Sequence, residues 1–168
     1  MTKVFEDYFS ELQADMVSIC LEYVSNKADM IYIYGSNEFG QFSTDVFYQI
    51  NNFFVEKHKV NDAVSDTDSN SRPVYNISKE KQVTLLNILN KNLREISDLC
   101  KKNNREMPTE MKLTYDVSKK KLDAEYSYEI KYTNDPENYL VIYLMIGSKN
   151  WAENYSLQAK RQNLTIQP

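Results

Sequence analysis

The sequence contains few of the residues on which the chemistry of most small enzymes and metalloproteins depends. Its 168 residues include two cysteines, Cys20 and Cys100, which exclude a disulfide scaffold and a cysteine-based zinc site. A single histidine, His58, excludes most histidine-rich metal chemistry. Three glycines and four prolines exclude a collagen, a linker protein and a glycine-rich phosphate loop. The formal net charge of −4 argues against an overall basic nucleic-acid-binding protein.

The sequence also lacks a long hydrophobic run. The longest apolar stretch, residues 139–146, is less than half of the roughly 20 residues that a membrane-spanning helix requires. The first residues are acidic and amphipathic, unlike a signal peptide. We therefore expect a cytoplasmic protein in a reducing compartment, with no membrane association.

The residues that are present indicate one folded domain with an uneven distribution of charge. The chain is 42% hydrophobic and 26% charged, as expected of a globular protein. Residues 1–76 contain 5 Lys or Arg and 12 Asp or Glu, whereas residues 77–168 contain 15 and 12. An acidic half can attract a basic partner and speed its association. The alternative is a solvated surface on which the charges have no partner to meet.

Hydrophobic periodicity predicts an α+β fold with a mainly antiparallel sheet of about five strands covered by two or three helices. We expect a turn over residues 35–40, a two-residue turn at Asn51-Asn52 and an exposed loop over 61–76. The apolar segment 139–146 fits a helix or a strand, and we favour a helix. A single domain would span 1–157, followed by a polar, frayed tail over 158–168. The predicted helices cover residues 5–23, 78–103 and the segment after Pro136, and the predicted strands cover 30–34, 42–50, 53–60, 111–117 and 122–132.

Candidate catalytic residues are few, and each has a structural interpretation that we prefer. His58 lies between two lysines and is expected on a strand surface, without a partner that would make it a base. Cys20 and Cys100 occupy apolar helix positions, where buried and inert thiols are common. We therefore predict a protein that is not an enzyme and has no catalytic residues.

Carboxylates form two groups of interest. The first group, Asp62, Asp66 and Asp68, lacks the glycine and the bidentate glutamate of a calcium loop. The second group, Glu125 and Glu129, shares one face of a predicted strand. Buried in a cleft, such carboxylates serve acid–base chemistry, but on a solvated face they meet solvent or a basic partner. We predict no metal and no cofactor.

The 13 tyrosines suit protein interfaces, because tyrosine combines an apolar ring with a polar tip. Stacking on nucleic-acid bases is a rival use that normally requires a positive groove. The run Lys119-Lys120-Lys121 keeps this alternative open, whereas the acidic N-terminal half argues against it. We expect no direct contact with nucleic acid.

Several segments of the chain share a pattern with a known family: 31–34, 45–51, 55–62, 104–113, 115–117, 122–124, 126–128 and 132–136. The most specific of them is Arg105–Lys112 with the hairpin that follows. Together they resemble the YezG-like immunity proteins of Gram-positive bacteria, and the resemblance covers roughly residues 4–138. It departs at residues 139–146, where family members usually continue with a charged amphipathic helix.

This resemblance implies an antitoxin that acts by binding. Relatives protect the cell from secreted polymorphic toxins, often nucleases, by binding the toxin domain in the cytoplasm, and they have no known catalytic residues. Because a nuclease groove holds phosphate and is positive, an inhibitor that presents carboxylates would associate quickly. From charge and expected exposure we select as candidate toxin contacts Glu38, Phe39, Asp62, Asp66, Asp68, Glu125 and Glu129. The alternative function is a non-catalytic, oligomeric scaffold that forms a homodimer through residues 139–146.

Overall fold

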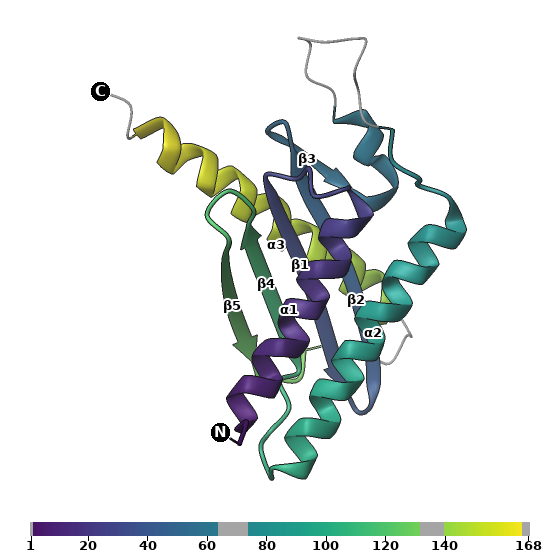
Figure 1. Ribbon diagram of the computed structural model, residues 1–168, viewed down its shortest axis with the longest axis vertical. Helices are drawn as coiled ribbons and strands as arrows, with labels where there is room; N and C mark the ends of the chain where they lie inside the picture. The colour runs from purple at the N-terminus through teal and green to yellow at the C-terminus, as the bar shows by residue number, and fades with distance from the viewer. Residues whose placement is uncertain (1, 64–73, 132–139, 166–168) are drawn as a thin grey trace.

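The computed structural model describes residues 2–63, 74–131 and 140–165, and it confirms the predicted α+β class. Five antiparallel strands form one sheet in the order β3-β2-β1-β4-β5 (Figure 1). The elements, in chain order, are α1 (Phe5–Tyr23), β1 (Met30–Glu38), β2 (Gln41–Ile50), β3 (Phe53–Glu56), the 3₁₀ helix η1 (Lys57–Asp62), α2 (Lys79–Lys102), β4 (Glu110–Asp116), β5 (Lys121–Ser127) and α3 (Leu140–Thr165).

Helices cover both faces of the sheet. Helices α1 and α2 pack together on one face, and α3 crosses the other (Figure 1). Alternation along β1 explains why both faces are apolar. Ile31 and Ile33 join the core beneath α1 and α2, whereas Tyr32 packs beneath α3. The central strand is therefore buried on both sides, as its nearly continuous apolar sequence requires.

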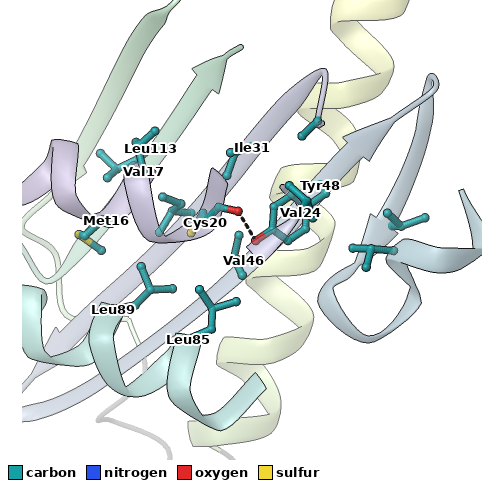
Figure 2. Close-up of a cluster of buried hydrophobic side chains, with 14 of the residues drawn as sticks. Met16, Val17, Cys20, Val24, Ile31, Val46, Tyr48, Leu85, Leu89 and Leu113 are labelled. Carbon is teal, nitrogen blue, oxygen red and sulfur yellow. Dashed lines mark hydrogen bonds between the residues drawn. The ribbon is translucent and has the colours of Figure 1, made fainter. Parts of the chain in front are cut away.

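The larger core consists mainly of aliphatic side chains from α1, α2 and the sheet (Figure 2). Met16 and Cys20 of α1 meet Leu85 and Leu89 of α2, and all four are almost completely buried. Tyr48 brings a phenol into this core, and its hydroxyl donates to the Cys20 carbonyl over 3.0 Å (Figure 2). The hydrogen bond satisfies this buried hydroxyl inside an otherwise apolar core.

The smaller core is aromatic and lies beneath α3. Trp151 and Tyr155 approach the ring of Tyr32 at centroid distances of 6.2 and 6.0 Å, and Ala152 is completely buried beside them. The predicted helix after Pro136 is thus confirmed. It continues past Gln158, where we predicted a polar tail, and is helical as far as Thr165. None of the helices in the described ranges has the length and apolarity needed to span a membrane.

Two strand boundaries differ from the prediction. β1 continues through Ser36 and Asn37 to Glu38, because β2 pairs with it along its whole length and β4 pairs as far as Ser36. The turn is therefore only Phe39-Gly40, with both residues at positive φ as a type I′ hairpin requires. The predicted strand 53–60 ends at Glu56, and a 3₁₀ helix that contains His58 replaces its second half. The prediction that His58 lies on a strand is therefore wrong.

The last hairpin also differs from the alternation that predicted it. β5 ends at Ser127 rather than at residue 132, because Ser127 already pairs with Glu110, the first residue of β4. Along β5 only Leu122 of the predicted apolar face is partly buried against the core, and Ala124 and Tyr126 are exposed. Helices α1 and α2 cover the central strands, so the edge strand keeps apolar side chains at the surface. Residues 132–139, which include Tyr132, lie outside the described residues.

Candidate protein-binding surface

A groove of about 590 Å³ lies between the start of α1, the connection from α2 to β4, and the end of β5. Its walls are mostly aromatic or apolar, with one arginine and one glutamate at the rim. The lining residues are Phe5, Phe9, Cys100, Arg105, Glu106, Pro108, Tyr126 and Tyr128.

Contacts among the groove residues hold several of the rings in place. Phe9 packs against Phe5 at 5.5 Å and meets Tyr126 edge-on at 5.8 Å, measured between ring centroids. The Arg105 guanidinium lies 4.3 Å from the Phe5 centroid, a cation–π distance. On the far side of Tyr126, the buried Gln13 donates from Nε2 to the tyrosine hydroxyl over 2.6 Å. A ligand would therefore meet preorganised rings, which lowers the entropy lost on binding.

Exposed apolar side chains continue from the groove around the same end of the sheet. Tyr128 and Ile130 are 50% and 51% exposed, and Phe39, at the β1–β2 turn, is 76% exposed. Hydrogen bonds join these segments: Thr109 accepts from Asn37 N and donates from its hydroxyl to the Glu129 carbonyl. We call this set of side chains the end surface and define it as Phe5, Phe9, Phe39, Arg105, Tyr126, Tyr128 and Ile130.

The end surface has the composition of an interface. Single exposed apolar residues are ordinary, but a gathering of aromatic residues with an arginine is typical of protein-binding sites. The backbone at Phe39 adds to this argument. Its φ of 50° is uncommon for a bulky residue, and its ring gains no burial in return. Strain and exposure at one position favour a functional role over a structural one.

The predicted contact residues are divided by the structure. Glu125 and Glu129 are exposed beside the end surface, and Phe39 is exposed within it. Glu38 is only 6% exposed and accepts the backbone N–H of Lys131 over 2.8 Å, so it braces this end rather than facing solvent. Asp62 is exposed in η1, which follows β3 at the opposite end of the sheet (Figure 1). Asp66 and Asp68 lie outside the described residues.

A second, acidic groove of about 350 Å³ separates α1 from α2. Four carboxylates line it, from Glu11, Asp15, Glu95 and Asp98. Lysines pair with three of them: Lys3 lies 2.6 Å from Glu11, while the exposed pairs on α2 span 3.5 and 3.8 Å. Exposed pairs of this kind contribute little to stability. We interpret this groove as a solvated helix face that adds to the negative field of the N-terminal half.

The most buried ionic cluster lies on the α3 face of the sheet. Burial alone would raise the pKa of Glu110, but hydrogen bonds from Lys131 (2.7 Å) and Tyr34 (2.8 Å) outweigh it, so the pKa lies below its ordinary value. Lys112 approaches the same carboxylate at 3.3 Å. These contacts engage both carboxylate oxygens. We interpret the cluster as a structural clamp between strands.

The remaining groups that could carry chemistry are the two thiols and the possible metal ligands. Burial raises the pKa of both thiols, Cys20 and Cys100, so neither is a reactive thiolate near neutral pH. In residues 2–63, 74–131 and 140–165, no three His, Cys, Asp or Glu residues form a group suited to a metal ion. Binding is the activity that the described side chains support best.

Sequence reasoning missed most of the groove. Phe5 and Phe9 follow the helical repeat that predicts α1, a pattern that does not reveal that they form the open margin of the core. Arg105 carried no signal of its own beyond the resemblance. Tyr128 and Ile130 continued the alternation of β5, which concealed that β4 offers them no partner. No protein-family model matches the sequence, and no curated protein matches it. The proposed function therefore depends on the surface itself and on the resemblance described above.

Proposed function

We propose that this protein is an immunity protein, which binds a cognate secreted toxin in the cytoplasm and neutralises it without catalysis. The observation that carries the proposal is the end surface, where strained Phe39, half-exposed Tyr128 and Ile130 and an aromatic groove meet at one end of the sheet. Buried aromatic anchors supply most of the binding energy in protein interfaces.

The position of the groove supports the proposal in a second way. The segment with the most specific resemblance to immunity proteins, residues 104–113, supplies Arg105, Glu106 and Pro108 to its wall. Arg105 and Glu106 are exposed and do not belong to the larger core, whereas Met111 and Leu113 of the same segment do. A segment that resembles a family and also lines a surface groove favours a shared binding role.

Electrostatics suit a basic partner. Glu125 and Glu129 lie beside the end surface, and the first 76 residues carry a net charge of −7 from 5 basic and 12 acidic residues. A toxin that acts on nucleic acid has a positive groove. Exposed carboxylates would raise the association rate at low salt, and the aromatic groove would slow dissociation.

In the first test, the tagged protein is expressed in its source bacterium at its native level and purified together with the proteins that bind it. A single stoichiometric partner with a toxin-like C-terminal domain is expected. That domain, expressed alone, should arrest growth, and co-expression of the immunity protein should restore it. Self-association with the co-encoded toxin domain left unbound would refute the proposal and favour the scaffold alternative.

Two variants test whether the end surface binds the toxin. Ile130→Ala removes an exposed apolar side chain from the end surface, and Val83→Ala does the same on the outer face of α2, where the valine is 45% exposed. We expect Ile130→Ala to weaken toxin binding by about tenfold and Val83→Ala to leave it unchanged. Equal effects of the two variants would remove the end surface from the proposal.

A further inference from the structure

We propose that the outer edge of β5 is the docking strand of this protein. An extended segment of the toxin would add to the sheet there, with apolar side chains toward the groove and basic side chains toward Glu125. This inference rests on the proposed function for the identity of the partner, but the edge itself can be tested without the toxin.

The open edge is the first observation. β5 is the last strand of the sheet, so alternate N–H and C=O groups along it point away from β4. Figure 1 shows no strand beyond it, and only the C-terminal end of α3 extends further to that side, above the β4–β5 turn. Native sheets usually protect such an edge with proline, lysine or a bulge. β5 contains no proline, its one lysine, Lys121, is its first residue, and the strand pairs with β4 in unbroken register.

The two faces of β5 define the chemistry of the added segment. Leu122, Ala124 and Tyr126 share one face, and Tyr126 continues directly into the aromatic groove. An apolar side chain opposite Tyr126 would therefore reach the rings of Phe9 and Tyr128. The segment matches this face if it carries an apolar residue at every second position.

The opposite face is acidic toward the end of the strand. Asp123 already pairs with Lys121 of the same strand at 3.0 Å. Lys112 of β4 lies opposite Glu125 in the register but pairs with Glu110 at 3.3 Å, and within the described part of the chain no ion pair forms at Glu125 or Glu129. Cross-strand pairs of opposite charge stabilise a sheet, so lysine or arginine is favoured opposite Glu125. The complete motif is an extended segment in which apolar and basic residues alternate.

Charge also disfavours a second copy of this chain at the same edge. An antiparallel pairing centred on Ala124 would set Asp123 of each copy opposite Glu125 of the other, and like charges directly opposite are destabilising. A register centred on Leu122 pairs Lys121 with Asp123 but uses only residues 121–123, because β5 begins at Lys121. A register centred on Asp123 pairs Lys121 with Glu125 but sets the two Asp123 side chains directly opposite each other. A different chain is therefore the better occupant.

A short peptide tests the edge directly. The probe is a seven-residue peptide of alternating lysine and valine, acetylated and amidated, titrated into the full-length ¹⁵N-labelled protein. Amide chemical shifts should change at residues 121–130. The matched control carries N-methyl groups on alternate residues, which keeps charge and side chains but removes the backbone donors. We expect the control to bind at least tenfold more weakly. Equal binding of the two peptides, or shifts confined to the acidic groove between α1 and α2, would overturn the proposal.

A charge reversal provides the second measurement. Glu125→Lys should weaken binding of the lysine–valine peptide about fivefold, because one cross-strand pair becomes repulsive. The control is Glu22→Lys, an exposed carboxylate near the end of α1 that changes the net charge equally. Equal weakening by both variants would show attraction by net charge alone and would overturn the docking strand. Light scattering that shows a dimer of the unmodified protein, which the lysine–valine peptide dissociates, would assign the edge to a second copy and would also overturn the docking strand.

The outcome with the toxin separates this inference from the proposed function. If Glu125→Lys weakens toxin binding and Glu22→Lys does not, the docking strand and the immunity function both stand. If neither variant affects toxin binding and the peptide shifts lie elsewhere, the docking strand is wrong while the immunity function stands. If the peptide binds β5 but no toxin is neutralised, the proposed function is wrong and the edge remains a strand-docking site.

Discussion

Replacement of Tyr48 by phenylalanine should show how the end of α1 is held against the sheet. The last carbonyls of a helix lack intrahelical donors. Here the Val24 N–H donates to the Leu21 carbonyl at 3.2 Å, and the Tyr48 hydroxyl donates to the Cys20 carbonyl at 3.0 Å. The phenol is completely buried, and burial raises its pKa well above the ordinary value, so it remains a donor into alkaline pH.

The variant Tyr48→Phe keeps the ring and removes only the hydroxyl. It deletes a buried hydrogen bond and leaves the Cys20 carbonyl without this donor, which together cost about 1–3 kcal/mol. The control is Tyr23→Phe. Tyr23 stacks on Tyr48 at 6.1 Å and donates to the Lys57 carbonyl at 3.1 Å, but it is only partly buried, so water can replace its bond. We expect Tyr23→Phe to lower the free energy of unfolding by about 0.5 kcal/mol.

Urea unfolding followed by far-UV circular dichroism measures both variants. Tyr48→Phe should lower the midpoint with an unchanged slope, because the surface exposed on unfolding stays the same. In thermal unfolding the change corresponds to about 2–4 °C for each kcal/mol. A loss for Tyr48→Phe no larger than that for Tyr23→Phe would refute the reasoning, since it would mean that the buried carbonyl does not need this donor.

Three further predictions follow from features of the sheet. Because the pKa of Glu110 is lowered on folding, its charge stabilises the protein above the ordinary value of 4.5, and this contribution is lost as pH falls through the folded pKa. Glu110→Gln should lower the free energy of unfolding by about 1–3 kcal/mol at pH 7. The urea midpoint of the variant should then fall less steeply than that of the unmodified protein as the pH is lowered, and an equally steep fall would contradict the clamp. Phe39→Asn should raise stability by about 1 kcal/mol, since asparagine tolerates the positive φ of 50°, yet weaken toxin binding; a variant that binds equally well would remove Phe39 from the interface. Ala152→Leu should overpack the completely buried site between Tyr32 and Phe47, cost about 1–3 kcal/mol and shift the emission of Trp151, and an unperturbed spectrum would show that α3 is not held there.

The element types were predictable because their signals are local. The repeat from Phe5 to Tyr23 and the Ser78 cap, which accepts from Lys81 N, mark helices α1 and α2. Asn51-Asn52 forms the predicted two-residue turn. Boundaries failed where a distant partner decided them. β1 continues to Glu38 because β2 pairs with it, and β5 ends because β4 begins at Glu110.

The candidate site was less predictable than the fold for the same reason. Exposure depends on which helix covers which strand, and a sequence pattern cannot distinguish a covered strand from an edge strand of the same alternation. Glu125 was predicted to face solvent, and it does. Glu38 was predicted to be exposed in a turn, but β1 extends through it, and Lys131 buries it. The groove joins Phe9, Arg105 and Tyr126, residues that are distant in sequence and that only the fold brings together.

The division of the sheet into an aliphatic and an aromatic face has a consequence for synthesis on the ribosome. Every strand and both helices of the larger core precede α3 in the chain, so this part can fold as it emerges. Until α3 follows, the rings of Tyr32, Phe47 and Phe54 face water on the other side of a formed sheet. A nascent chain stalled at this stage would present an adhesive aromatic surface. Slow translation between β5 and the emergence of α3 should therefore increase capture of the nascent chain by chaperones.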